Sequence, residues 1–329
     1  MNPEAALVLS VHAARRHSSM IEAAGLSKNY GRTRAVDGLN FEVRSGVVTG
    51  FLGPNGSGKS TTMRMVLGLD RPTAGTVTVD GRHYHDLKWP LREVGALLEA
   101  NAIHPGRSAR NHLLGLAHSN AIPPVRVDEV LGLVGLDAVS GRKAGKFSLG
   151  MSQRLGIASA LLGDPGVLLF DEPVNGLDPE GILWVRTLLQ SLAAEGRTVF
   201  VSSHLMSEMA LTATDLVVIG RGRLIADTTV DDFINSNTEA TVLVRSPEVD
   251  RLAGVLTSIG ASVAHGGNGS LLVTKAFPAV IGDAAHTAGI ALHELTPQQA
   301  SLEQVFMDLT SDAVDFHGGR PRTADEVPS

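Results

Sequence analysis

Apolar residues gather in short runs that alternate with stretches of helical periodicity from about residue 20 to residue 234. Val47–Leu52 and Val167–Phe170 are apolar runs of strand length, whereas Glu180–Ala194 places leucines near helical spacing. Strands that alternate with helices predict a mostly parallel sheet with helices on both faces. Further strands are expected at Val77–Val79, Val94–Leu98, Thr198–Val201 and Leu216–Ile219, and further helices at Lys59–Leu69, Asn111–His118, Val127–Val134 and Met151–Leu162.

A second pattern begins near Glu239 and runs strand, helix, strand, strand, helix, strand. That order is typical of the ferredoxin-like split βαββαβ unit, and a final helix follows it. A glycine-rich turn, Gly266–Gly269, joins the two central strands. The strands are expected at Thr241–Arg245, Ala261–Ala264, Ser270–Lys275 and Ile290–Leu295, and the helices at Val249–Ile259, Pro278–Ala288 and Leu302–Leu309.

These patterns divide the chain into four segments. Residues 20–235 are expected to form a large α/β domain, and residues 236–310 a small α+β domain of ferredoxin-like type. Residues 1–19 precede the first strand-like run, and residues 311–329 are polar with Gly and Pro. Both terminal segments are therefore predicted to be disordered.

Composition excludes several classes of function. The 329 residues contain no cysteine, which rules out disulfide scaffolds, cysteine-ligated zinc and thiol catalysis. A net charge of −6 argues against a nucleic-acid partner. No apolar run approaches the roughly 18 residues of a membrane helix, and Ala5–Val11 is too brief for a signal peptide. We therefore expect a chain that stays in the cytoplasm.

A phosphate-binding loop follows the Val47–Leu52 strand and opens a helix, which is the context that the motif G-x-x-x-x-G-K-[ST] requires. Glycines let backbone N–H groups wrap phosphates, and the helix N-terminus adds partial positive charge. Lys59 can reach the β- and γ-phosphates of ATP, and the Ser60 hydroxyl can bind Mg²⁺; we place the adjoining Thr61 with the nucleotide-binding residues. The motif is Gly53-Pro54-Asn55-Gly56-Ser57-Gly58-Lys59-Ser60.

Two acids end the apolar strand Val167–Phe170. Asp171 is expected at the carboxyl edge of the sheet, beside the phosphate loop, where it would hold Mg²⁺ directly or through water. Glu172 points the opposite way along the strand and can orient, or accept a proton from, an attacking water. Together with the lysine loop, the pair predicts an ATP-hydrolysing site.

The ordered set of motifs resembles the nucleotide-binding subunits of ABC transporters over roughly residues 20–234. The sequence Phe147-Ser148-Leu149-Gly150-Met151-Ser152-Gln153-Arg154 is similar to the family's LSGGQ signature. Gly176-Leu177-Asp178-Pro179 is similar to its D-loop. His204 resembles the switch histidine, and Tyr30 stands where the family keeps an aromatic residue that stacks on adenine.

The resemblance implies a head-to-tail homodimer that holds ATP between the phosphate loop of one subunit and the signature segment of the other. Ser148 and Gly150 would then bind the γ-phosphate of the partner's ATP, and Asp178 would contact the opposite subunit. Lys59, Glu172 and His204 would be catalytic, with His204 on the γ-phosphate. Ser60, Asp171 and Glu99 would be the magnesium ligands, Glu99 from the loop where the family usually has Gln.

Two substitutions depart from the signature, since Leu149 replaces its first Gly and Met151 its Gln. The segment Val94–Ala100 and the segment Ser301–Phe306 resemble the branch of exporters linked to bacitracin and other antibiotic resistance. The resemblance thus implies an ATPase that binds the cytoplasmic side of a separate membrane permease and drives export of a drug, antibiotic or lipid-like compound. The surface that contacts the permease would lie between Glu99 and Lys146.

Two other functions remain as alternatives. A soluble ABC ATPase acting on ribosomes or DNA is disfavoured by the single set of motifs, the absence of sustained heptads and the acidic charge. A nucleotide-binding regulator is the other, with a small ligand bound by the C-terminal unit. We predict instead that this unit caps or regulates the dimer.

Overall fold

The computed structural model describes residues 20–99, 102–236, 241–298 and 302–310. The segments 1–19 and 311–329, for which disorder is predicted, lie outside these ranges. Two compact units divide the chain, and the second comprises Thr229–Leu309, so it begins ahead of the boundary at residue 236 expected from the sequence. Each unit has a hydrophobic core of its own.

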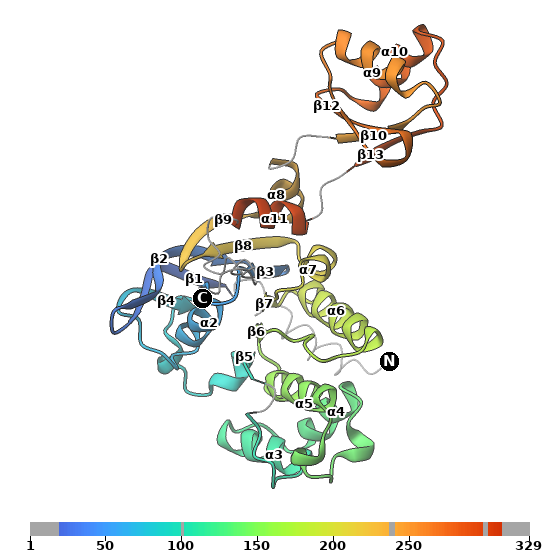
Figure 1. Cartoon of the computed structure of the whole chain (residues 1–329). Coiled ribbons are helices and arrows are strands. Elements are labelled where there is room, and N and C mark those ends of the chain that lie inside the picture. Colours follow the sequence, from blue (N-terminus) through green and yellow to red (C-terminus); the bar gives the residue numbers. More distant parts are fainter. Residues whose placement is uncertain (1–19, 100–101, 237–240, 299–301, 311–329) are drawn as a thin grey trace, which may run out of the picture. The chain divides into compact units, whose positions relative to one another are not determined.

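Among the described residues, six strands form the central sheet of the first unit (Figure 1). Every neighbouring pair from β5 to β8 is parallel, so the carboxyl ends of these strands share one edge. The strand β3 is buried along its whole length, as expected of a central strand covered on both faces. In sheet order the strands are β5 (Val94–Leu97), β6 (Val167–Asp171), β7 (Thr198–Ser202), β3 (Val48–Leu52), β8 (Asp215–Gly220) and β9 (Arg223–Thr229).

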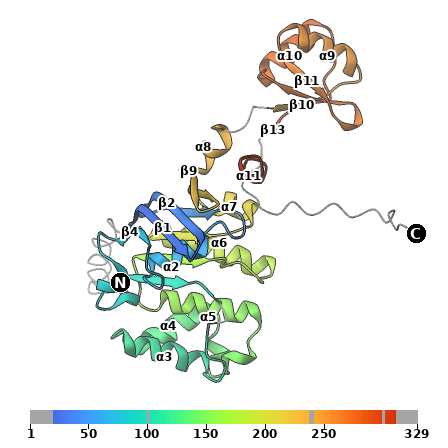
Figure 2. The ribbon, with the colours of Figure 1, turned by 60° about the vertical axis from the view of Figure 1, so that its left-hand side comes forward.

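An antiparallel sheet in the order β2-β1-β4 packs beside the central sheet. Helix α2 (Lys59–Val66) contacts β2, β4 and β6, so it lies between the two sheets (Figure 1 and Figure 2). Phe41 of β2 stacks on Phe200 of β7 with ring centroids 5.7 Å apart, which joins the sheets into one core. The three strands are β1 (Ile21–Tyr30), β2 (Thr33–Val43) and β4 (Ala74–Val79).

The sequence pattern did not predict β1 and β2. Buried residues of β1 follow one another at Ile21, Ala23 and Leu26, and the pairing shifts register between Ala23 and Leu26. Gly25 lies in this irregularity with φ +59°, a conformation that favours glycine. The bulge therefore breaks the period of two by which a half-buried strand is recognised.

Three helices form a subdomain beside the central sheet. They pack against one another, and α5 also packs against β5 (Figure 1). Ser108 and Ser148 cap α3 and α5, each accepting a hydrogen bond from the backbone amide three residues later at 3.2 Å. The helices are α3 (Ala109–Ser119), α4 (Val125–Leu133) and α5 (Leu149–Leu161).

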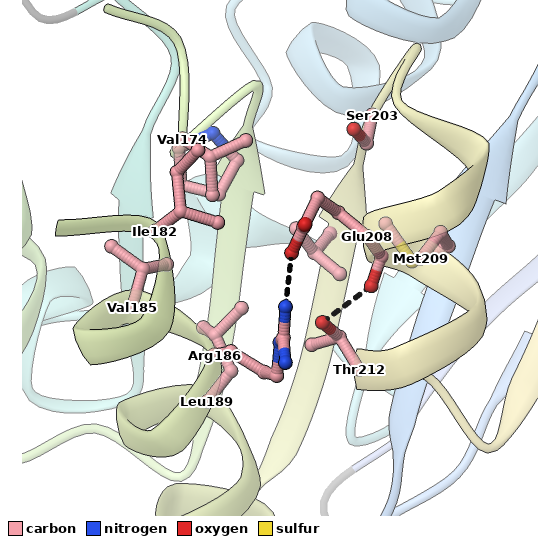
Figure 3. A pocket seen from close by; sticks show the side chains of 11 residues that line it. Val174, Ile182, Val185, Arg186, Leu189, Ser203, Glu208, Met209 and Thr212 are labelled. Carbon is pink, nitrogen blue, oxygen red and sulfur yellow. Dashed lines mark hydrogen bonds and ion pairs between the residues drawn. The ribbon is translucent and has the colours of Figure 1, made fainter. Parts of the chain in front are cut away.

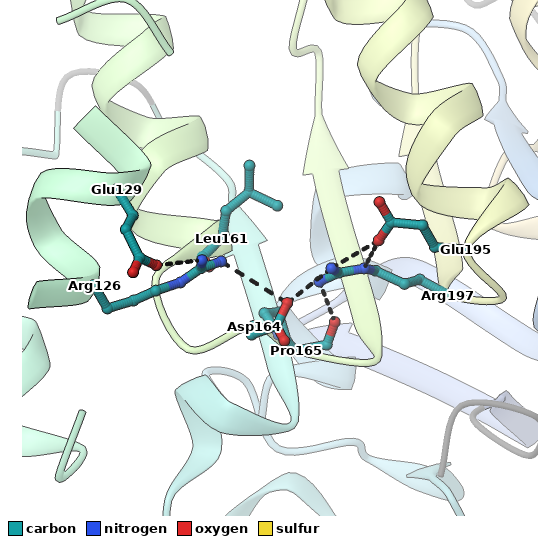
Figure 4. Close-up of polar contacts among 7 residues, drawn as sticks. All are labelled: Arg126, Glu129, Leu161, Asp164, Pro165, Glu195 and Arg197. Carbon is teal, nitrogen blue, oxygen red and sulfur yellow. Dashed lines mark hydrogen bonds and ion pairs between the residues drawn. The ribbon is translucent and has the colours of Figure 1, made fainter. Parts of the chain in front are cut away.

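An arginine–aspartate network ties α4 to the amino end of β7 (Figure 4). Arg197, with a side chain only 8% exposed, contacts Asp164 at 2.7 Å and donates to the Pro165 carbonyl oxygen at 3.1 Å. Arg126 of α4 lies 3.8 Å from the same Asp164 carboxylate oxygen. Asp164 itself has φ +53°, a backbone conformation that is rare outside glycine. The two arginine cations on its carboxylate help to hold the residue in that conformation.

The Arg197→Met substitution is expected to lower the free energy of unfolding of the first unit by about 2 kcal/mol, because it leaves a partly exposed carboxylate without its nearest cation. Urea unfolding followed by tryptophan fluorescence measures this, since Trp89 and Trp184 both lie in the first unit. Arg110→Met is the control, because the Arg110–Asp128 pair is exposed and screened by solvent, so a smaller loss of stability is expected. Equal losses in the two variants would contradict the argument.

Helix α6 (Pro179–Ala194) contacts β3 and β7, and α7 (Met206–Thr212) contacts α6. Asp178 caps α6, accepting from the Gly181 amide at 2.9 Å, and Pro179 occupies its first turn. Helices α8 (Val230–Ser236) and α11 (Leu302–Thr310) fall within the second unit, except for the last residue of α11. No helix in the described ranges has the length and apolarity to cross a bilayer.

The second unit carries an antiparallel sheet in the order β11-β12-β10-β13, which is the strand order of the split βαββαβ unit. Val244, Leu252, Leu271 and Ile281 are buried in the core between this sheet and its helices. The elements are β10 (Thr241–Arg245), α9 (Val249–Ser258), β11 (Ser262–His265), β12 (Ser270–Thr274), α10 (Pro278–Thr287) and β13 (Glu294–Gln298).

The last strand was expected at Ile290–Leu295, but it begins at Glu294. Ile290 instead belongs to the turn that closes α10 beyond Thr287, because its amide donates to the Ala285 carbonyl oxygen at 2.9 Å and its side chain is buried. Gly289, with φ +64°, forms the left-handed end of that helix. An apolar helix end was thus mistaken for the start of a strand.

Candidate active site

The phosphate loop joins β3 to α2 at the carboxyl edge of the central sheet. Gly56 and Gly58 have φ +80° and +105°, a region that disfavours other residues. A Cβ on Gly58 would lie 2.5 Å from the Ala35 carbonyl oxygen, and a Cβ on Gly53 would lie 2.6 Å from that of Ile219. The glycines are therefore required both by backbone conformation and by the close packing of neighbouring strands.

Lys59, the first residue of α2, is buried with 7% exposure. Its Nζ donates to the carbonyl oxygens of Gly53 at 2.6 Å and of Pro54 at 3.2 Å, so the ammonium is held across the loop. Burial lowers the pKa of Lys59, and the negative charges of Glu172 and Asp171 oppose this shift. A cation is thereby placed among carbonyl oxygens at the start of a helix.

The hydroxyl of Ser57 is buried and has no hydrogen-bond partner among the described residues. A buried hydroxyl without a partner is costly, and a phosphate oxygen in the loop would satisfy it. Asn55 and Ser60 are exposed, while Pro54 and Thr61 are half-buried. The loop therefore fits a phosphate, with the Ser60 hydroxyl left available at the surface.

The two acids lie where β6 ends. Asp171 pairs with Ser202 at the end of β7, and the Ser202 hydroxyl donates to the Asp171 carboxylate. Glu172 has φ +52°, and its amide donates to the Ser202 carbonyl oxygen at 3.2 Å. The acids end β6 and the phosphate loop follows β3, and both strands pair in parallel with β7 between them, so the two groups lie at the same edge of the sheet.

His204 and Glu172 form a direct pair. The His204 ring nitrogen Nδ1 lies 2.7 Å from Glu172 Oε2, and the His204 backbone amide donates to the same oxygen at 3.3 Å. The histidine side chain is half exposed, whereas the glutamate is 21% exposed. The pair orients the carboxylate toward a partly open edge of the site, where a water has access.

Tyr30 ends β1, and its hydroxyl donates to Asp70 Oδ2 at 2.9 Å. Arg64 Nε donates to that same oxygen at 2.7 Å and holds the pKa of Asp70 below its usual value. The Lys28 ammonium lies 5.1 Å from the ring centroid, a cation–π distance. Burial, and then the Asp70 hydrogen bond, raise the pKa of the Tyr30 hydroxyl. Asp70, absent from the sequence prediction, therefore fixes the ring.

The remaining predicted site residues are Glu99, Ser148, Gly150 and Asp178, and they lie apart from Lys59 and Glu172 in the hydrogen-bond network of the described residues. Glu99 is exposed just after β5 and directly precedes residues 100–101, which are outside the described ranges. Ser148 and Asp178 cap α5 and α6, and Gly150 lies in the first turn of α5. These four are not joined by hydrogen bonds to Lys59 or Glu172. Their nucleotide contacts stay predictions, because Ser148, Gly150 and Asp178 were expected to act on a second subunit.

A small cavity lies between α6, α7 and β7, behind the loop of His204 (Figure 3). Arg186 crosses it and contacts Glu208 at 2.6 Å, and its Nε is buried without a partner in the described ranges. A volume of about 20 Å³ admits one water and no nucleotide. None of the residues that line the cavity belongs to the phosphate loop, so the cavity is separate from the candidate nucleotide site.

Two families match separate parts of the chain. Residues 36–175 match the family described as ABC transporter, and residues 240–303 match one described as a domain of unknown function. The bacitracin transport ATP-binding protein BcrA of Bacillus licheniformis is 42% identical over 228 residues, which span 67% of this chain and 73% of BcrA.

The chain belongs to the family of ABC transporter ATP-binding proteins. Another relative is the lantibiotic transport protein SrtF of Streptococcus pyogenes, 35% identical over 66% of this chain and 93% of SrtF. The Nod factor export ATP-binding protein I of Cupriavidus pinatubonensis is 34% identical over 89% of this chain and 91% of its own. As a member of this family, the chain is an ATPase.

Solved structures confirm the α/β cassette fold predicted from the sequence. The ATP-binding subunit of an ABC transporter matches with a TM-score of 0.61 and 25% identity, over 66% of this chain and 92% of that one. The cassette MJ0796, solved as a dimer in a post-hydrolysis state with ADP and phosphate, matches with a TM-score of 0.59 and 25% identity, over 64% and 98%.

Proposed function

We propose that this ABC ATPase powers export of a drug, antibiotic or lipid-like compound through a separate membrane permease. One observation carries the catalytic part of the proposal. The buried ammonium of Lys59 lies across the phosphate loop, at the same sheet edge as Asp171 and the Glu172–His204 pair. Cation, metal-binding acid and base are the groups that phosphoryl transfer to water requires.

Each residue has a role that follows from its position. The loop amides and Lys59 bind the β- and γ-phosphates of ATP, and the face of the Tyr30 ring stacks on its adenine ring. Glu172 orients the attacking water and accepts its proton, while His204 holds the carboxylate in place. Ser60, Asp171 and Glu99 supply the oxygen ligands that Mg²⁺ prefers, and bound Mg²⁺ would neutralise charge on the phosphates.

The functional form that we propose is a head-to-tail homodimer. The MJ0796 cassette, to which the chain is similar, was solved as a dimer with ADP and phosphate. In the proposed dimer Ser148, Gly150 and Asp178 face the other subunit, and Ser148 and the N-terminus of α5 bind the γ-phosphate of its ATP. Ser148 and Asp178 are exposed and Gly150 is half-buried, so all three are accessible to a second subunit.

The relatives support a proposal for the cargo class and the cellular place. BcrA and SrtF are named for bacitracin and lantibiotic transport, and the third relative for Nod factor export. We infer that the present chain acts on the cytoplasmic face of the membrane, on a compound of a similar class. The second unit is assigned a role in capping or regulating the dimer.

Co-expression with a multi-span membrane protein whose gene adjoins that of this chain tests the transport proposal. The chain is expected to sediment with vesicles that contain that protein, and to hydrolyse ATP with Mg²⁺ but not with EDTA. Vesicles without the permease are the control, because the described helices include none that could cross a bilayer. Equal sedimentation with both kinds of vesicle, or activation by a soluble partner instead, would contradict the proposal.

A further inference from the structure

One face of α5 lies along the segment that runs from Glu172 into α6. At its first turn, Leu149 packs on Gly176 so closely that a Cβ on the glycine would lie 2.0 Å from the leucine Cδ2. Gly176 also has φ +73°, a backbone conformation that favours glycine. One turn further along α5, the Arg154 guanidinium stacks on Trp184 of α6 at 4.4 Å.

Between these two contacts, Gln153 reaches the main chain of Glu172. Its Nε2 donates to the Glu172 carbonyl oxygen at 3.1 Å, and the glutamine is only 4% exposed. The Glu172 amide is held from the opposite side by Ser202. Both backbone groups of Glu172 are therefore fixed by other elements.

This fixing has a physical reason. Glu172 has φ +52°, in the left-handed region that a residue with a Cβ seldom adopts and that persists only when surrounding contacts enforce it. A main-chain rotation there would swing the carboxylate away from the site. The buried amide of Gln153 is the contact that α5 contributes to prevent it.

We propose that Gln153 is a positioning residue for ATP hydrolysis, which joins the signature helix α5 to the catalytic carboxylate of the same chain. The inference rests on the proposed function of Glu172 as the base. Because Ser148 at the start of α5 faces the partner's nucleotide in the proposed dimer, the helix links ATP at that interface to the base of this chain's own site.

The test replaces Gln153 by Met, which has a similar length and helix propensity but no donor. We expect kcat to fall about 10- to 100-fold, as for other residues that orient a catalytic group, with the Kd for ATP changed less than about 2-fold. Gln190→Met is the matched control. Gln190 also donates to a backbone carbonyl oxygen, that of Leu211 at 2.9 Å, but it lies on the exposed side of α6. The kcat of the Gln190→Met variant is expected to stay unchanged.

A double variant separates positioning from general damage to the fold. When Glu172→Gln already removes the base, adding Gln153→Met is expected to cause no further fall in the single-turnover rate. The inference would be overturned if Gln153→Met lowered the single-turnover rate of the Glu172→Gln protein by the same factor as it lowers the rate of the unaltered chain. It would also be overturned if Gln153→Met and Gln190→Met lowered kcat equally. If Gln153→Met weakens folding, Gln153→Asn, which keeps an amide one methylene too short, is measured in the same cycle. No Mg²⁺-dependent hydrolysis by the unaltered chain would instead overturn the proposed function, and this inference with it.

Discussion

The Glu172→Gln variant is expected to bind ATP as the unaltered chain does and to hydrolyse it about 10²- to 10⁴-fold more slowly, the usual contribution of a general base. An amide cannot accept a proton from water, and it loses the charge that pairs with His204 at 2.7 Å. The phosphate loop and Lys59 are untouched, so the nucleotide remains held. In the proposed dimer, ATP that is not hydrolysed keeps the two subunits together.

Phosphate release at saturating ATP measures the rate, and size-exclusion chromatography with light scattering detects the ATP-bound dimer. Glu180→Gln is the control, because this exposed acid lies only eight positions further along, in the first turn of α6. Its rate is expected to stay within about 2-fold, as for most surface changes. Hydrolysis by Glu172→Gln near the original rate would show that another group activates the water.

The Lys59→Ala variant is expected to bind ATP roughly 30- to 4,000-fold more weakly, which corresponds to about 2–5 kcal/mol for truncating one partner of a buried charged contact. Lys59 is the buried cation of the loop, and its removal leaves the carbonyl oxygens of Gly53 and Pro54 without their donor. The loss therefore falls on phosphate binding, and hydrolysis disappears with it.

Isothermal titration with Mg²⁺–ATP and with Mg²⁺–ADP measures the change. Lys88→Ala is the comparison, because Lys88 is exposed and remote from the loop in sequence; its affinity is expected to stay unchanged. An unfolding curve by tryptophan fluorescence shows whether the first unit remains folded. Unchanged affinity in a folded Lys59→Ala protein would rule out the phosphate loop as the nucleotide site.

Much of the parallel core could be predicted from the sequence, because its strands are continuous apolar runs. Val48–Leu52 and Val167–Asp171 lie within one residue of the expected strands, since both are buried on two faces and bounded by turns or charges. Strands β1 and β2 received no bounds from the sequence pattern, because exposed positions and the irregularity at Gly25 interrupt their alternation. Periodicity detects burial, and it loses its signal where a strand bulges.

Some residues of the candidate site could be found from local sequence motifs, and others only from contacts in the folded chain. Lys59 and the acids were found because their motifs occupy consecutive positions. Asp70 and Gln153 were not, since each acts on a residue distant in sequence, Tyr30 and Glu172 respectively. Gln153 had one usable signal, a polar side chain on the otherwise apolar face of α5, between Leu149 and Ile157. A lone amide in such a place needs a partner, but only the folded chain identifies it.

The two carbonyl oxygens that hold Lys59 also bear on the thermodynamics of nucleotide capture. A free lysine side chain sacrifices up to about 2 kcal/mol of rotational freedom when a ligand immobilises it. Here that ordering has already happened during folding, because the buried ammonium is anchored to Gly53 and Pro54. An arriving triphosphate need only exchange oxygen partners around a stationary cation, so little entropy is lost at this residue as the complex forms.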